Sequence, residues 1–86
     1  MANVTVGNTA TLIVAANTAR LSLIIENNGS VPVYIGQDAS VSVSNGIVLK
    51  PNGNLTEDSG GARMYQGDIY GITASSADVR VWERNR

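Results

Sequence analysis

The sequence contains no cysteine, no histidine and no phenylalanine, and only two of its 86 residues are proline. Without cysteine and histidine, the chain has no thiol nucleophile, no imidazole base and no soft ligand for zinc. Disulfides and a zinc site, which reinforce many small domains, are excluded for the same reason. Carboxylates, hydroxyls and lysine remain, but no motif groups them for catalysis. We therefore predict that the protein is not an enzyme and uses no metal ion and no cofactor.

Charge is also scarce: six Lys and Arg residues are balanced by seven Asp and Glu residues, for a formal net charge of −1. This balance offers no basic field to a phosphate backbone, so nucleic acid is not expected as a partner. The longest apolar run, residues 12–16, is far shorter than the roughly 18 residues of a membrane span, and it lacks the basic flank of a signal peptide. We expect no membrane partner and synthesis in the cytoplasm.

The length of the chain allows one domain with one core, residues 1–86, close to the lower limit for domains that fold unaided. Such small domains are usually reinforced by disulfides, by a metal or by association with other protein. Because the composition excludes the first two, association remains. We expect the chain to form a homo-oligomer or to attach to a larger assembly.

Val, Ile, Thr and Ser dominate the sequence, and apolar residues recur with the period of two that is typical of strands. Asn28-Gly29, Asn45-Gly46 and Pro51-Asn52-Gly53 are typical of tight turns between them. Strands are expected at residues 3–6, 11–15, 21–26, 31–35, 40–44, 54–57, 69–74 and 78–83. This pattern predicts an all-β fold, a small antiparallel β-sandwich or a partly closed, jelly-roll-like barrel of seven to nine short strands.

The last expected strand separates apolar from charged residues. Val79 and Val81 alternate with Arg80, Trp82 and Arg84, so the two sets belong to opposite faces. If the valines face the core, Trp82 lies outward between two arginines, and Trp and Arg are the residues most enriched at interface hot spots. The alternative is that Trp82 caps the end of its own sandwich and the arginines pack along it.

A second set of candidates comes from the two tyrosine-containing strands. Alternation in residues 31–35 places Pro32 and Tyr34 opposite the aliphatic residues, and Tyr70 is expected to leave the core beside Ile72. Proline has no N–H, so this strand is expected at a sheet edge, either bordering a subunit contact or simply closing the core. The candidate residues of a protein interface are Trp82, Arg80, Arg84, Tyr34, Pro32 and Tyr70.

Motifs that together span most of the chain follow one another in a fixed order. They are Arg20, Leu21, Leu23, Ile25, Asn27 and Gly29, the run 31–36, Asn45-Gly46-Ile47 with Leu49, Pro51 and Gly53, and the runs 69–74 and 77–81. In this order they resemble a recurrent small β-domain of tailed-phage virion proteins, found in small proteins encoded near head genes and in domains of head fibres.

The resemblance implies a virion structural protein with the role of a capsid decoration, or cement, protein. Such a protein is a homotrimer on the outer surface of an icosahedral head, bound over junctions between subunits of the major capsid protein. The resemblance supplies no catalytic residues and no capsid-facing motif. The sequence also leaves open whether residues 1–7 pair within their own subunit or with another.

The alternative is a glycan-binding or receptor-binding module of a phage fibre. Four aromatic side chains, Tyr34, Tyr65, Tyr70 and Trp82, could stack on a sugar ring. With no Phe in the chain, however, the core needs the same residues. The sequence ends shortly after the last expected strand, so we expect no fibre stalk, which favours the decoration role.

Overall fold

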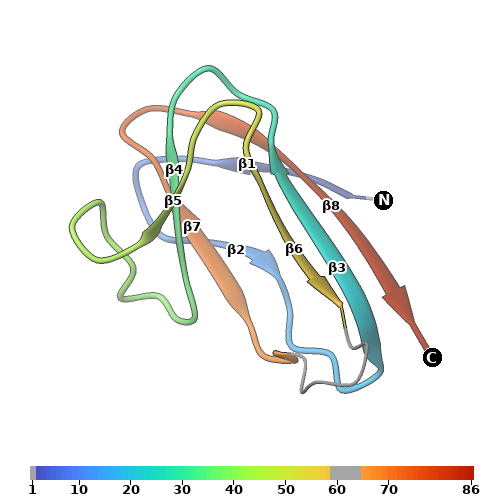
Figure 1. The fold of residues 1–86 in the computed structure, drawn as a ribbon. Coiled ribbons are helices and arrows are strands. Elements are labelled where there is room, and N and C mark those ends of the chain that lie inside the picture. Colours follow the sequence, from blue (N-terminus) through green and yellow to red (C-terminus); the bar gives the residue numbers. More distant parts are fainter. Residues whose placement is uncertain (1, 59–64) are drawn as a thin grey trace.

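The computed structural model describes residues 2–58 and 65–86, and all regular structure in these residues is β-strand (Figure 1). The strands are β1 (Ala2–Val6), β2 (Thr11–Val14), β3 (Arg20–Asn27), β4 (Val33–Gly36), β5 (Ile47–Leu49), β6 (Asn54–Asp58), β7 (Ile69–Ile72) and β8 (Ala77–Asn85). The all-β prediction is confirmed, and the eight strands fall within the expected range. No helix in the described part of the chain is long and apolar enough to cross a membrane.

The strands form two antiparallel sheets of four that face each other. Sheet A has the order β1-β8-β3-β6 and sheet B the order β2-β7-β4-β5. Figure 1 shows β2, β4, β5 and β7 on one side of the molecule and β3, β6 and β8 on the other. Among the described residues no ladder joins the two sheets, so the fold is a sandwich, the first of the two expected architectures, and not a closed barrel.

The core lies between the sheets and consists of the aliphatic residues that alternation directs inward. In β8, for example, Val79 and Val81 are buried while Arg80 and Trp82 between and beside them are exposed. The buried cluster comprises Val6, Ile13, Leu23, Ile25, Val33, Ile35, Leu49, Ile69, Ala77, Val79 and Val81. The tyrosines contribute little to this cluster, because only Tyr65 packs against it.

Two fully buried polar side chains close the two ends of β3. At its end, the Asn27 amide donates to the carbonyl oxygens of Val31 (2.8 Å) and Leu49 (2.9 Å) and accepts from the amide of Gly29 (2.9 Å). At its start, Arg20 bonds to Glu83 and to three backbone carbonyls. Each polar group is satisfied, which is the condition for burying it without a large loss of stability.

The expected strand at residues 40–44 is wrong, because this segment forms turns. Its polar side chains bond to nearby backbone instead of leaving the backbone free for a sheet: the amide of Ser42 donates to Asn45 Oδ1 (2.8 Å), and the amide of Ser44 donates to Ser42 Oγ (3.2 Å). Such local bonds compete with a strand ladder. The strand in this region is β5, three residues that the sequence pattern did not predict.

Pro32 was expected inside an edge strand, and this prediction is also wrong. Strand β4 begins one residue later, at Val33, and lies inside sheet B between β7 and β5. Pro32 could not donate to an internal ladder, so the strand starts after it. Its carbonyl is used all the same, because the hydroxyl of Thr73 donates to it (2.6 Å).

Two further features complete the fold. Strand β1 pairs with β8 of the same chain, with Val4 opposite Val79. In the turn before β6, Asn52 adopts a positive φ of 66°, which confirms the expected tight turn.

Candidate protein-binding faces

The outer face of sheet A carries the charged and aromatic residues predicted from the last strand. Trp82 is 44% exposed, and Arg80 and Arg84 on either side of it are also exposed. Because Val79 and Val81 are buried, Trp82 lies outward between two arginines, which is the first of the two arrangements that the sequence left open.

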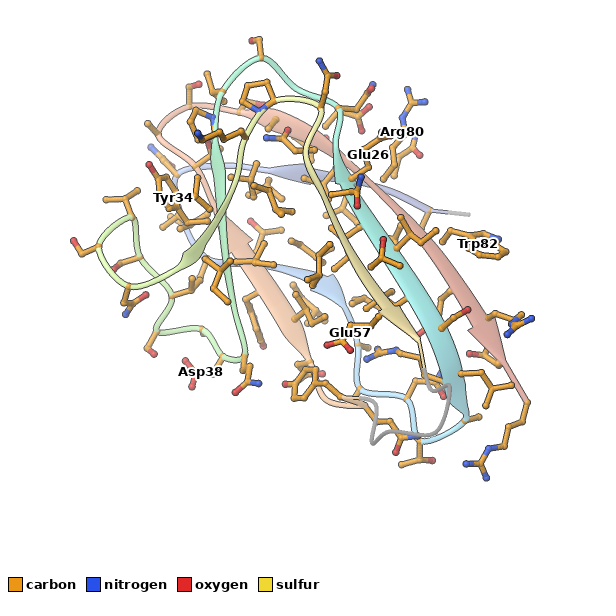
Figure 2. All side chains as sticks on the ribbon, in the orientation of Figure 1. Glu26, Tyr34, Asp38, Glu57, Arg80 and Trp82 are labelled. Atoms are coloured by element: carbon orange, nitrogen blue, oxygen red, sulfur yellow. The ribbon has the colours of Figure 1, made fainter. Side chains whose placement is uncertain are left out.

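Strand pairing sets a second row of side chains beside these residues on β3. In the antiparallel register Ile24 is opposite Trp82, and Glu26 is opposite Arg80. Figure 2 shows Glu26 and Arg80 beside each other, with Trp82 farther along the same face. A shallow groove lies here, and its lining includes Ile24, Glu26, Asn54, Arg80 and Trp82. The face thus combines an apolar centre with charges of both signs.

Within its own strand, Arg80 contacts a carboxylate of the same face. Its Nε lies 3.3 Å from Oδ2 of Asp78, and both side chains are about half exposed, at 47% and 40%. Solvent screens such a pair, so it contributes little to the stability of the fold. The arginine therefore remains chemically available to a partner.

The outer face of sheet B has a different chemistry. Tyr34 of β4 is opposite Ile72 of β7 and Val48 of β5, while Tyr70 of β7 is opposite Leu12 of β2. Leu12 and Val48 are each 43% exposed, and the other three are partly buried. These five residues, which we call the sheet B patch, form a continuous apolar and aromatic surface across all four strands.

No charged residue occurs in any strand of sheet B. The four strands have the sequences TLIV, VYIG, IVL and IYGI. All the charged residues in strands of the described chain belong to sheet A: Arg20, Glu26, Glu57, Asp58, Asp78, Arg80, Glu83 and Arg84. An exposed edge or face without charge is unprotected against association, whereas most monomeric proteins protect such surfaces with charges.

The connection between β4 and β5, residues 37–46, folds over one end of the sheet B patch. Val41 of this connection is buried although it lies outside the cluster between the sheets, and it occupies the space that a side chain at Gly36 or Gly46 would take. Near the start of the connection, Asp38 accepts bonds from the hydroxyl and the backbone amide of Ser40. These bonds hold the pKa of Asp38 below its ordinary value.

A separate apolar cleft of about 150 Å³ opens between the sheets at the side where β5 and β6 form edges. Ile47 of β5 lies at its mouth and is 68% exposed. Its neighbour in sequence, Val48, points to the opposite face of the same strand. Ile47 and Val48, although adjacent in β5, therefore belong to two different surfaces.

The six candidate interface residues do not form one site. Trp82, Arg80 and Arg84 belong to the outer face of sheet A, whereas Tyr34 and Tyr70 belong to the sheet B patch; Figure 2 shows Tyr34 and Trp82 on opposite sides of the molecule. Pro32 is exposed in the connection before β4.

The four aromatic residues are dispersed as well. The hydroxyl of Tyr65 donates to the backbone carbonyl of Asp68 (2.6 Å), and the ring packs against the core. Only Tyr34 and Tyr70 share a surface, so the aromatic residues do not line a single sugar-binding site.

The sequence analysis did not single out four residues that complete these faces, namely Ile24 and Glu26 on sheet A and Leu12 and Val48 on sheet B. Alternation along the strand already placed Ile24 and Glu26 opposite Leu23 and Ile25. Alternation does not predict which strands are neighbours in the sheet. Pairing of neighbouring strands brings single exposed residues together into one surface.

Within residues 2–58 and 65–86, no three acidic side chains gather where they could hold a metal ion. Comparisons of the chain with models of protein families, with curated proteins and with solved structures find no match.

Proposed function

We propose that this chain is a capsid decoration protein of a tailed-phage virion, which binds the major capsid protein through the sheet B patch and holds neighbouring capsid subunits together. It catalyses no reaction in this role. The observation that carries the proposal is the sheet B patch itself, an apolar and aromatic sheet face without any charged residue in its strands.

The chemistry of the patch suits the centre of a protein interface. Interface centres are depleted in charged residues and enriched in aromatic ones, because burying an unpaired charge is costly. Tyr34 and Tyr70 supply rigid apolar surface together with hydroxyls that can still find a partner. Leu12 and Val48 extend the surface to both edge strands of the sheet.

The size of the chain also fits attachment to a larger assembly. An interface of standard size takes about 800 Å² from each partner, about one sixth of the 4946 Å² that this chain exposes. A small protein that gives up this share of its surface gains much stability from its partner. If three copies act together, as the resemblance implies, simultaneous attachment at three points adds avidity without any new contact.

The test uses expanded capsids assembled from the major capsid protein encoded by the same genome and free of this protein. Cosedimentation measures binding of the purified wild type and of three variants, Leu12→Lys, Val48→Lys and Ile47→Lys. We expect the first two to lower capsid affinity by at least about 100-fold, since each buries an ammonium group in the interface. Ile47→Lys is the matched control, because the same change in the same strand alters the other face.

Circular dichroism confirms that each variant is folded. Loss of binding in all three variants alike, or in none, would contradict docking through the sheet B patch. Wild-type protein that ignores capsids but binds members of a glycan array would instead support the fibre-module alternative.

A further inference from the structure

On the outer face of sheet A, the side chains of the two central strands are complementary to each other in charge and in apolar character. Strands β3 and β8 lie side by side in the middle of the sheet. In register, Glu26 of β3 is opposite Arg80 of β8, and Ile24 is opposite Trp82. One of these rows therefore pairs an anion with a cation, and the other an aliphatic with an aromatic side chain. In the next row, Ser22 is opposite Arg84.

This arrangement determines what would happen if a second copy packed on the same face. A two-fold axis that runs along the strands, midway between β3 and β8, places β8 of one copy over β3 of its partner and leaves the rows in register. Arg80 of each copy then faces Glu26 of the other, and Trp82 of each faces Ile24 of the other. No like charges meet in these two rows.

We propose that a second copy of this chain packs its sheet A against the outer face of sheet A about this two-fold axis. The contact is isologous, so every interaction occurs twice and the contact closes after two copies. The groove that Ile24, Asn54 and Trp82 help to line provides the space into which the tryptophan of the partner fits.

The dimensions of the face are sufficient for this contact. The two longer extents of the molecule are 36 and 23 Å, and a face of that size offers about 800 Å², the area each partner contributes to an interface of standard size. Trp and Arg lie at its centre, as in many hot spots. Two packed sheets align their strands to within about 30°, an orientation that this axis permits.

The inference is independent of the capsid role, because it concerns the face opposite the sheet B patch. A pairwise contact also differs from the three-fold arrangement that the sequence resemblance implies. The mass of the oligomer in solution therefore distinguishes a dimer from a trimer. With both faces in use, sheet B would attach to a partner while sheet A joins two copies.

The decisive test mixes two charge-reversed variants of the full chain, Glu26→Arg and Arg80→Glu. Light scattering over a dilution series gives the dissociation constant of the dimer. Alone, each variant presents two like-charge pairs to its own copy, and we expect the dissociation constant to rise about 10-fold per pair, about 100-fold in total. In an equal mixture, both pairs become complementary, so we expect a mixed dimer with an affinity within about 10-fold of the wild type.

The mixture distinguishes contact between copies from contact within one chain. Each variant keeps two like charges at residues 26 and 80 of its own chain, so only contact with the other variant can pair them with opposite charges. Lys50→Glu changes the net charge as Arg80→Glu does but lies outside the face, in the exposed segment before β6. Alone it should dimerise like the wild type. Mixed with Glu26→Arg it should dimerise with itself and leave Glu26→Arg monomeric, because a mixed contact would keep one like-charge pair. Trp82→Ala should raise the dissociation constant at least about 10-fold without unfolding the chain.

Three results would overturn the inference: a mixture of the two reversed variants that remains monomeric, a wild-type oligomer whose mass neither reversal changes, and a wild-type chain that is monomeric up to about 1 mM.

Discussion

Arg20 and Glu83 form an ion pair of 2.6 Å between the guanidinium Nε and the carboxylate, and the arginine side chain is completely buried. The same guanidinium donates to the carbonyl oxygens of Ala15 (2.8 Å), Tyr65 (3.0 Å) and Gly67 (3.3 Å). Arg20 of sheet A therefore binds both the segment that follows β2 and the segment that precedes β7, two neighbouring strands of sheet B. In a fold without disulfides, it acts as a non-covalent brace.

Removing the anion from this pair should be costly. We expect Glu83→Ala to lower the free energy of unfolding by about 3 kcal/mol, because it leaves the buried guanidinium without a counter-ion. Arg20→Ala should cost at least as much, since it also leaves three carbonyl groups without their donor. Urea unfolding measures both variants. Two variants that unfold at the wild-type urea concentration would show that the brace contributes nothing.

We expect the fold to lose stability when Asn27 is replaced by a smaller or by a charged residue. Asn27→Ala removes three hydrogen bonds and is expected to cost about 3 kcal/mol. Asn27→Asp should cost more at pH 7, because a carboxylate cannot donate to the two carbonyl oxygens that the amide now serves. At acidic pH the introduced carboxyl is protonated and can donate once, so the difference between the two variants should narrow. Urea midpoints at several pH values test this ordering.

Two glycines provide a comparison of close packing with open space. A Cβ at Gly29 would lie 2.8 Å from Cβ and 3.0 Å from Cα of Ala77, whereas a Cβ at Gly7 would meet no atom within 4 Å. We expect Gly29→Ala to lower the free energy of unfolding by about 2 kcal/mol through overpacking. Gly7→Ala should change it by less than about 0.5 kcal/mol. Equal melting temperatures for the two variants would disprove the close contact.

The connection over the sheet B patch should respond to acid through Asp38. The pKa of this carboxyl is lowered by the hydroxyl and amide bonds from Ser40, so the folded state favours the ionised form. Its contribution to stability is present above the pKa of the unfolded chain, near pH 4, and is lost as the pH falls through the lower, folded pKa. An NMR titration should show a midpoint below the ordinary value, and Ser40→Ala should move it upward. An unchanged midpoint in that variant would assign the shift to another cause.

Seven of the eight strands were predictable because their side chains alternate and because Gly, Asn or Pro separates them. The same alternation placed Val79 and Val81 together on one face and Arg80 and Trp82 on the other, and the structure shows that the valines face inward. The errors arose where a local bond competed with the pattern. Backbone amides in residues 40–44 donate hydrogen bonds to the side chains of Asn45 and Ser42, and Pro32 delays the start of β4.

Alternation and composition alone therefore determined the all-β class, the antiparallel pairing, the separation of Trp82 from Val79 and Val81 on opposite faces of one strand, and the lack of cysteine and histidine chemistry. These are properties of a strand and its own side chains. Only the tertiary structure decided that Trp82 and Tyr34 lie on opposite faces, that sheet B has no charged residue in its strands and that Glu26 is opposite Arg80. The reason is physical: a strand determines which residues share its own face, but contacts between residues far apart in the sequence determine which strands become neighbours.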